Sequence, residues 1–330
     1  MRLQHDPAWM QHVSAAEHFG RVAVLAGGDS SERAISLLSG AAVLEALRRR
    51  GVAAEIFDPS ERPLAELCAA RIDRVWIALH GPGGEDGTVQ GALEWLGVPY
   101  TGSGVMGSAI GMDKLRTKRL AKAIGVASPA ALALGGAEDF ELALEQLGLP
   151  LIVKPASQGS SVGMSKVESA ADLPLAYAAA RAVERDVFAE AWIGGGEYTV
   201  ALLKGVALPS IRIETPRNFY DYEAKYVRED TRYLCPSGLS EPAERHLASL
   251  ARAAFAAAGA EGWGRADFRA DASGRPLLLE INTVPGMTGH SLVPKAARAV
   301  GMDFDELVWR VLETSFTRRA AGAAEGAARS

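Results

Sequence analysis

The sequence predicts an α/β protein in which a parallel sheet near the N-terminus is followed by further lobes that mix helices and strands. Over the first hundred residues, short apolar runs alternate with amphipathic helical patterns. This alternation is typical of parallel strands whose sheet is covered by helices. The length of 330 residues exceeds that of one ordinary domain, so we expect two or three.

Composition and charge exclude several classes of protein. Hydrophobic residues make up 48% and charged residues 23% of the chain, which is ordinary usage for folded domains and excludes wholesale disorder. The net charge of -5 is spread along the chain without a basic stretch, so we expect no nucleic-acid partner. Apolar runs reach only about six residues, far below the ~18 that cross a bilayer, so we expect no membrane partner.

The ends of the chain and its cysteines bear on the compartment. The first 20 residues contain histidines, an aspartate and a glutamate and lack the apolar core of a secretory signal, which favours a cytoplasmic protein. Cys68 and Cys235 are far apart and show no pairing pattern, so we expect two free thiols.

The first predicted unit spans residues 21–102, after an N-terminal extension over residues 1–20. An apolar strand over 21–26 ends in two glycines, and Ser30 and Ser31 then offer N-caps to a helical pattern that stops at Gly51. The remaining expected elements are strands over 52–57 and 74–79 and a helix over 87–96.

A central unit is expected over residues 103–189 and a C-terminal unit over 190–314, followed by a disordered tail over 315–330. The polar segment 214–238 has few core-forming side chains, which is typical of a lid. The expected helices of these two units are 113–124, 172–185, 242–258, 293–300 and 304–312, and the expected strands are 149–154, 187–191, 198–203, 264–270 and 277–282, with a Pro/Gly break over 128–136.

The last two expected strands are predicted to form a hairpin with an unusual polar face. If the turn is centred on 273–274, Asp267 lies opposite Glu280, and Arg265 lies opposite Asn282. Residues two apart share a face, so all four side chains project the same way. Two carboxylates this close repel unless a cation neutralises them, and Mg²⁺ prefers carboxylate and amide oxygens. The alternative is an exposed hairpin whose polar face is simply hydrated, and a bulge would change the pairing.

Two lysines and a glycine-serine loop suggest contacts to phosphate. Lys154 ends an apolar strand and precedes a loop in which glycines would let backbone N–H groups approach phosphate oxygens. The loop is not the Walker A pattern, since its lysine precedes the glycines, and a flexible turn would explain them equally well. Lys114 begins a basic amphipathic helix, where a solvated lysine is the simpler interpretation.

Together these residues resemble the D-alanine–D-alanine ligase family of the ATP-grasp superfamily. The resemblance extends over roughly residues 21–314, with several long motifs in the right order. The matching segments are GGDSSER (27–33), HGPGGEDGTVQG (80–91), YTGSGVMGSAIGMDK (100–114), VKPASQGSSVGMSKV (153–167), FYDYEAKY (219–226), GWGRADF (262–268) and EINTVPGMTGHSLVP (280–294).

The resemblance implies an ATP-grasp fold, in which two lobes clamp ATP beside an N-terminal α/β domain. Members join two D-alanines for peptidoglycan precursor synthesis, with ADP and phosphate as the other products. They are usually homodimers. The first carboxylate takes the γ-phosphoryl group to give D-alanyl phosphate, and the second amine then attacks. By this resemblance two Mg²⁺ ions, for which Mn²⁺ substitutes, are held by Asp267, Glu280 and Asn282.

The same resemblance implies contacts to ATP and to the tetrahedral oxyanion. Lys114, Lys154 and Lys225 would contact the phosphates, and Arg265 and the N–H of Gly286 the oxyanion. The adenosine contacts would be Glu190 and Ile193 at the adenine edge, Trp192, Phe219 and Leu279 as apolar walls, and Glu197 at the ribose. Family members often have a lysine at the position of Ala191, and its absence weakens the expectation of tight nucleotide affinity.

For the amino-acid substrates, the resemblance implies that Glu32 binds the first ammonium and is linked to Ser160 and Tyr226. Ser291 and the N–H of Leu292 would hold the second carboxylate, beside a helix N-terminus. Two further expectations have simpler alternatives. Glu32 would also suit the helix dipole, and His80, which faces the site in the family, is as often a structural histidine.

Three other functions are alternatives to this ligase reaction. Another ATP-grasp carboxylate-amine ligase, or a D-alanine:D-lactate ligase, would share the fold, although Tyr226 in the lid speaks against ester formation. A Rossmann oxidoreductase is suggested only by the first strand, Gly-Gly and helix, and the chain lacks G-x-G-x-x-G there. An amino-acid-binding protein without catalysis would not need the acidic hairpin face.

Overall fold

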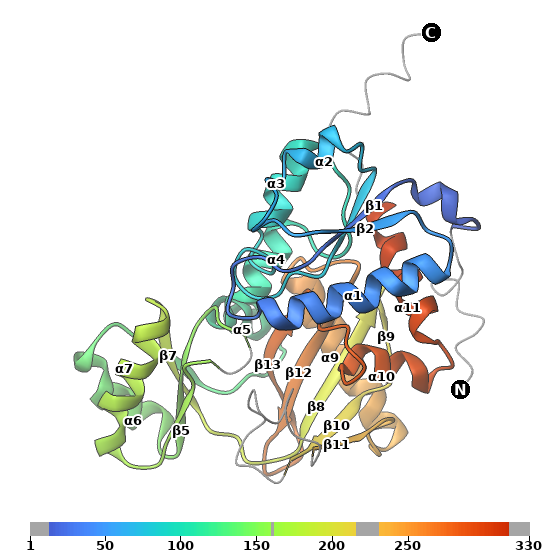
Figure 1. Ribbon diagram of the computed structural model, residues 1–330. Helices are drawn as coiled ribbons and strands as arrows, with labels where there is room; N and C mark the ends of the chain where they lie inside the picture. Colours follow the sequence, from blue (N-terminus) through green and yellow to red (C-terminus); the bar gives the residue numbers. More distant parts are fainter. Residues whose placement is uncertain (1–12, 160–161, 216–230, 317–330) are drawn as a thin grey trace, which may run out of the picture.

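The N-terminal part of the computed structural model is a three-stranded parallel sheet in the order β2-β1-β3 (Figure 1). The structure describes residues 13–159, 162–215 and 231–316. The strands and helices of this part are β1 (Val22–Leu25), α1 (Arg33–Arg49), β2 (Ala54–Phe57), α2 (Glu66–Ala69), β3 (Arg74–Ile77), α3 (Thr88–Leu96) and α4 (Val105–Met112). All four residues of β1 are buried because the strand is central, which agrees with the apolar run in the sequence.

A four-stranded antiparallel sheet in the order β4-β7-β5-β6 forms a separate lobe. Its elements are β4 (Ala131–Leu134), α6 (Phe140–Leu147), β5 (Leu151–Pro155), β6 (Ser165–Val167), α7 (Leu173–Val183) and β7 (Val187–Ala191). The helices α6 and α7 lie together on the outer side of this lobe (Figure 1). Small residues of both helices, such as Ala143 and Ala176, pack against the apolar strands in one core.

The third sheet has the order β11-β10-β8-β12-β13, and β9 also pairs with β8. Its strands are β8 (Glu197–Leu203), β9 (Val206–Ala207), β10 (Ile211–Glu214), β11 (Arg232–Leu234), β12 (Trp263–Ala270) and β13 (Pro276–Asn282). The helices α5 (Lys114–Ala123) and α9 (Glu241–Ala257) contribute to its core. Alternate β12 residues Ala266 and Phe268 point into this core, which leaves Arg265 and Asp267 on the other face.

The last helices return to the N-terminal sheet, although the sequence assigned them to the C-terminal unit. α10 (Leu292–Ala299) and α11 (Phe304–Glu313) share one apolar core with β1 and β3. Arg49 at the end of α1 pairs with Asp305, with a shortest N···O distance of 2.6 Å, and Arg50 pairs with Glu306. Chain segments about 256 residues apart are therefore joined by packing and ion pairs.

Several expected boundaries differ from the structure. Ser315 and Phe316, placed in a disordered tail, belong to a 3-10 helix over Thr314–Phe316, because the Arg74 guanidinium holds both the Phe316 ring and the Ser315 hydroxyl. Part of the expected Pro/Gly break forms β4, whose partner β7 supplies the hydrogen bonds that local sequence does not reveal. The expected boundary at 189/190 falls inside β7. Residues 1–12 of the extension and 317–330 of the tail lie outside the described residues.

The segment expected as a lid is bounded by paired strands. β10 ends at Glu214. β11 was expected to be part of a loop, but it pairs with β10 so that Arg232 lies opposite Glu214. The intervening residues 216–230 lie outside the described residues. The lid expectation therefore remains untested over most of its length.

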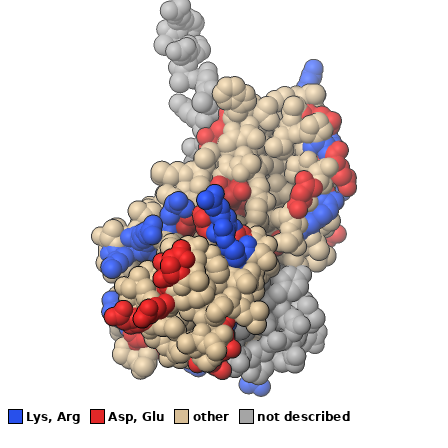
Figure 2. Space-filling view, turned by 90° about the vertical axis from the view of Figure 1, so that its left-hand side faces the viewer, with Lys and Arg blue, Asp and Glu red and all other residues tan. Residues whose placement is uncertain are grey.

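The surface carries both signs of charge. Basic side chains form a short band across the middle of the face in Figure 2, with acidic side chains beside and below it. Within the described part of the chain, none of the helices has both the length and the apolar character of a membrane span. Cys68 and Cys235 are both free, as expected.

Candidate active site

The hairpin register predicted from the sequence is confirmed at the four polar positions. Asp267 pairs with Glu280 and Arg265 with Asn282. Nearer the turn the register shifts by one residue, because Phe268 pairs with Leu278 and leaves Leu279 as the extra residue of a bulge. Next to the turn the pairing is centred on Ser273, half a residue from the expected centre at 273–274. The extra residue Leu279 offsets this difference, so the predicted pairing holds at the site.

Asp267 is held by a cation and a hydroxyl. Arg265 binds both of its carboxylate oxygens, with N···O distances of 2.8 and 2.9 Å, in the bidentate geometry that favours arginine. Thr199 on the neighbouring β8 donates its hydroxyl to the same carboxylate at 2.6 Å. These contacts fix the orientation of both Arg265 and Asp267 on the polar face of the hairpin, where both side chains are largely buried.

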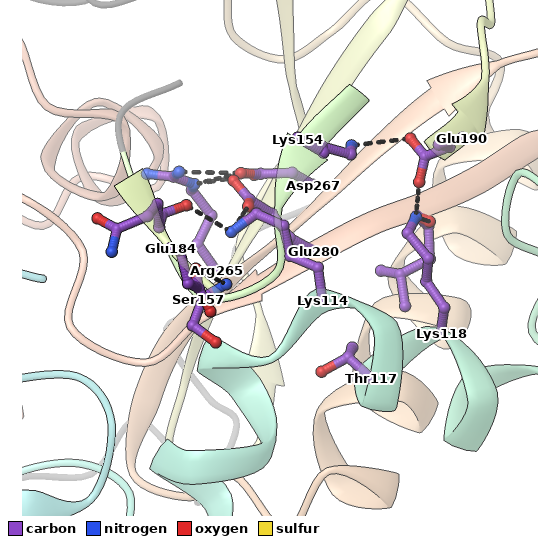
Figure 3. Close-up of polar contacts among 12 residues, drawn as sticks. Lys114, Thr117, Lys118, Lys154, Ser157, Glu184, Glu190, Arg265, Asp267 and Glu280 are labelled. Carbon is purple, nitrogen blue, oxygen red and sulfur yellow. Dashed lines mark hydrogen bonds and ion pairs between the residues drawn. The ribbon is translucent and has the colours of Figure 1, made fainter. Parts of the chain in front are cut away.

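Glu280 is paired with Lys114, the first residue of α5, at an Nζ–Oε2 distance of 3.1 Å (Figure 3). The Lys114 ammonium also donates to the Gln158 carbonyl at 2.7 Å, in the loop after β5. Burial acts to lower the pKa of Lys114, but the facing Glu280, together with Glu85 and Glu184, holds that pKa above its ordinary value. Lys114 is therefore a buried, charged group beside the paired carboxylates, not a solvated lysine.

A second cluster contains Lys118, which the sequence analysis missed. Its ammonium lies 2.5 Å from one oxygen of Glu190, while Lys154 binds the other oxygen at 2.9 Å. All three side chains are at least nine-tenths buried. Burial favours the neutral acid, but the two lysines together hold the pKa of Glu190 below its ordinary value. Lys118 follows Lys114 by one helical turn, and this spacing on a helix with one buried face was the available signal.

Beyond this cluster, two cationic side chains contact the Trp192 ring. Lys166 and Arg269 approach its ring at 5.0 and 4.7 Å from the centroid. Arg269 also faces Glu197 at 3.7 Å. Ile193, just after β7, and Leu279, on β13, are half-buried. Sequence reasoning did not single out Lys166 or Arg269, whose neighbours are set by strand pairing between distant segments.

A pocket brings together candidate residues that lie far apart in the chain. Its lining includes Glu32, His80, Arg265, Glu280, Asn282, Gly286, Ser291 and Leu292. Gly159 approaches the Glu32 carboxylate so closely that a Cβ there would lie 2.6 Å from one oxygen. A glycine at this position therefore lets the loop backbone reach Glu32.

His80 is held on both ring nitrogens. Its Nδ1 lies 3.0 Å from the Val284 carbonyl, which can only accept, so Nδ1 carries a hydrogen when this bond forms. Nε2 then accepts from the Ser39 hydroxyl at 3.1 Å, and Ser39 also accepts from the Met287 N–H. Glu85, another residue the sequence analysis passed over, lies 3.5 Å from Nδ1. His80 thus connects α1 to the loop after β13.

The loop after β13 places side-chain oxygens at one end of the pocket. The Ser291 hydroxyl accepts from the Thr288 N–H at 2.8 Å and lies where a Cβ of Gly286 would approach it within 3.0 Å. Ser291 is the N-cap residue of α10, so the first N–H groups of that helix start beside it. The Asn282 side-chain oxygen accepts from the Val284 N–H at 3.0 Å, which orients that amide.

Four of the predicted site residues lie outside the described residues. They are Ser160, Phe219, Lys225 and Tyr226. The expected links from Glu32 to Ser160 and Tyr226, and the lid contact of Lys225, therefore stay predictions.

The two antiparallel sheets, with buried lysines paired to the carboxylates of Glu190 and Glu280, define the protein as an ATP-grasp enzyme. Two family models match the chain: the D-ala D-ala ligase N-terminus over residues 57–103 and the D-ala D-ala ligase C-terminus over residues 120–313. The chain belongs to the D-alanine–D-alanine ligase family.

Relatives and solved structures agree with this membership. The D-alanine–D-alanine ligase of Alkalilimnicola ehrlichii is 60% identical over 92% of this chain and 97% of its own length. That of Laribacter hongkongensis is 56% identical over 90% and 96%. The Bacillus anthracis ligase complexed with ATP is 32% identical and superposes with a TM-score of 0.80 over 90% of this chain and 97% of that one. The VanG D-Ala:D-Ser ligase of Enterococcus faecalis is 27% identical, with a TM-score of 0.75 over 89% and 99%.

Proposed function

We infer that this chain joins two D-alanines to D-alanyl-D-alanine for peptidoglycan synthesis, at the expense of ATP. Relatives of 53–60% identity that carry this activity in their names support the inference over an ester-forming or other ATP-grasp ligase. A free carboxylate is a poor electrophile, so it first takes the γ-phosphoryl group to form D-alanyl phosphate. The amine of the second D-alanine then attacks the acyl carbon, and inorganic phosphate leaves.

One observation carries this proposal: acidic and basic side chains are paired in the wall of the pocket that contains Glu32 and directly beside it. Asp267 and Glu280 face each other, and Arg265 and Lys114 supply positive charge beside them. Phosphoryl transfer needs mainly positioning and neutralisation of negative charge. This arrangement provides both next to a site for an amino acid.

The side chains on the hairpin face also fit Mg²⁺. Asp267, Glu280 and Asn282 offer only oxygen donors from one face, and the carboxylates already attract two cationic side chains there. We propose that these three residues would hold two Mg²⁺ ions. When bound, the ions would neutralise the phosphate oxygens and align the γ-phosphoryl group with the attacking carboxylate.

The proposed substrate contacts follow from charge and position. Glu32 would bind the ammonium of the first D-alanine, since it is a buried carboxylate on the pocket wall. Ser291 and the N–H of Leu292 would bind the second carboxylate, aided by the partial positive charge at the start of α10. The side chain of Arg265 and the N–H of Gly286 would stabilise the oxyanion that forms at the acyl carbon.

We propose His80 as a positioning residue of this pocket. Both of its nitrogens already have partners, one of them a backbone carbonyl. These two contacts hold the loop that carries Gly286 and Ser291 against α1.

For ATP, we propose that Lys114 and Lys154 contact the phosphates, together with Lys225. Glu190, Trp192, Ile193, Phe219 and Leu279 are proposed to surround the adenine, with Glu197 at the ribose. The cations beside Trp192 support this assignment, since they add positive charge next to the proposed nucleotide site.

We also propose a cytoplasmic homodimer. α3 and α4 expose apolar side chains that a second copy could cover, among them Trp95 at 92% and Met106 at 65% exposure. A Cβ at Gly91 of α3 would lie 3.8 Å from Val105 of α4, so the two helices meet beneath this surface. The surface lies on the N-terminal part of the molecule.

Phosphate release from ATP tests the proposed function. The purified protein should release phosphate with D-alanine and not with L-alanine, and the product should be the dipeptide by mass spectrometry. D-lactate and D-serine offered with D-alanine would reveal the ester and D-alanyl-D-serine alternatives. Phosphate release that does not depend on D-alanine would refute the assignment.

A further inference from the structure

The cluster around Glu190 contains more positive charge than its carboxylate needs. Lys118 from α5 and Lys154 from β5 reach the two oxygens of one buried side chain from different sides (Figure 3). One carboxylate can balance only one of these ammonium groups. The second positive charge must therefore have another purpose or another partner.

The two lysines are held very differently. The Lys118 ammonium forms an ion pair with the Glu190 carboxylate at 2.5 Å and donates hydrogen bonds to the Ser128 hydroxyl at 3.1 Å and the Leu278 carbonyl at 3.2 Å. These three contacts come from three different segments of the chain and hold the ammonium in place. Lys154 bonds to Glu190 and lies 5.3 Å from the centre of the Phe188 ring.

The position of Lys118 also links both sheets. Glu190 belongs to β7 of the four-stranded lobe, whereas Leu278 belongs to β13 of the large sheet. Ser128, between α5 and β4, donates to the same Leu278 carbonyl at 2.9 Å. Lys118 is thus anchored at the junction between the two halves of the nucleotide site and is poorly suited to follow a ligand.

We propose that Lys118 is a positioning residue for ATP: it keeps the buried Glu190 carboxylate compensated, so that Lys154 can turn from Glu190 to the phosphates of ATP. Without Lys118, that movement would leave a buried carboxylate without a counter-charge, which is strongly unfavourable. Glu190 would then retain Lys154 and compete with ATP for it. The inference rests on the proposed function only in taking ATP as the ligand of Lys154.

The surrounding charges agree with a cation that is held in place at neutral pH. Glu190 and, farther away, Glu280 favour the charged form of Lys118, while Lys154 opposes it. Burial lowers the pKa of Lys118 to about 8, so its ammonium form still predominates at pH 7.

The test compares Lys118→Met, Glu190→Gln and the double variant. In Lys118→Met the KM for ATP should rise at least ~10-fold, while kcat at saturating ATP and the KM for D-alanine stay within ~2-fold of wild type. In the Glu190→Gln background no carboxylate retains Lys154, so adding Lys118→Met should raise the KM for ATP by less than ~3-fold. A side chain that only supports folding would not give this dependence on Glu190.

Lys122→Met is the matched control, because Lys122 lies one turn further along α5 with an exposed side chain. It should leave all constants unchanged. Equal effects of Lys118→Met in the wild-type and Glu190→Gln backgrounds, or an unchanged KM for ATP, would overturn the proposal. If Lys118→Met does not fold, the Glu190→Gln pair and Lys118→Arg, which should stay within ~3-fold of wild type, still decide the matter.

The proposed function is tested separately. Calorimetric titration with ATP alone measures nucleotide binding without any turnover of D-alanine. A wild-type protein that binds ATP but forms no dipeptide would refute the proposed function and leave the Lys118 comparison intact. Unchanged ATP affinity in a folded Lys118→Met protein would refute the inference and leave the function intact.

Discussion

Replacing Glu280 with glutamine removes one charge from the hairpin face and changes the shape of the side chain very little. Glu280 faces Asp267 across the hairpin, and its carboxylate is paired with Lys114 at 3.1 Å. The substitution therefore separates the need for a charged ligand from the need for a side chain of this size.

Glu280→Gln should weaken folding moderately, because the buried Lys114 ammonium loses its counter-charge. At an effective dielectric constant of about 20, the attraction to Lys114 at 3.1 Å amounts to about 5 kcal/mol before desolvation and screening. Removing the repulsion from Asp267, about 3 kcal/mol for charges ~5 Å apart on the same scale, offsets part of this loss. The free energy of unfolding should therefore fall by ~2 kcal/mol, which leaves the protein folded.

Catalysis should change far more, because charge at the transferring phosphoryl group is stabilised through this carboxylate. Loss of one preorganised electrostatic group costs roughly 100- to 1000-fold in kcat, or ~3–4 kcal/mol. We therefore expect kcat for D-alanine-dependent phosphate release to fall at least ~100-fold in Glu280→Gln at every Mg²⁺ concentration.

The assay is phosphate release from ATP across a Mg²⁺ titration, with thermal unfolding measured on the same samples. Glu241→Gln is the control, since Glu241 is 79% exposed on α9, where it pairs only with Arg245 among the described contacts. A Glu280→Gln protein with near-wild-type kcat at ordinary Mg²⁺ would refute the metal assignment. A loss of activity that merely follows unfolding would refute the energetic argument.

Three further predictions concern pH, core packing and assembly. Burial lowers the pKa of Lys118 to about 8, so its positive charge is present below that pH and lost above it. The KM for ATP should therefore rise from pH 8 upward. In Lys118→Arg, a profile of KM against pH should show this rise at higher pH. Phe268 is fully buried, and Phe268→Ala should lower the free energy of unfolding by ~3–5 kcal/mol in urea titrations, with an unchanged midpoint as the contrary result. Trp95→Glu should shift the protein from dimer to monomer in sedimentation velocity, and a dimer of undiminished stability would place the interface elsewhere.

Local patterns in the sequence were sufficient for most elements. The apolar runs and the 3.6-residue period predicted β1, α1 and α9 to within a few residues. β4 and β11 were missed, since each is short and is defined by its partner strand more than by its own residues. Short strands of this kind depend on tertiary hydrogen bonds.

The candidate site also contains some features that local sequence predicts and others that it does not. The pairing of Asp267 with Glu280 was predictable, because a hairpin is a local structure and its two-residue alternation decides which side chains share a face. The family resemblance supplied the expected roles of residues that local patterns leave ambiguous, such as Lys114. Neither source predicted that Lys118 would share the carboxylate of Glu190.

The sequence by itself determined the class of fold, the family and the polar face of the β12–β13 hairpin, because these depend on nearest neighbours in the chain and on motif order. Only the tertiary structure decided which charges compensate one another. Lys118 meets Leu278 across 160 residues, and Ser39 meets Met287 across 248. Contacts between such distant segments arise from the packing of complete sheets and helices, which no local periodicity encodes.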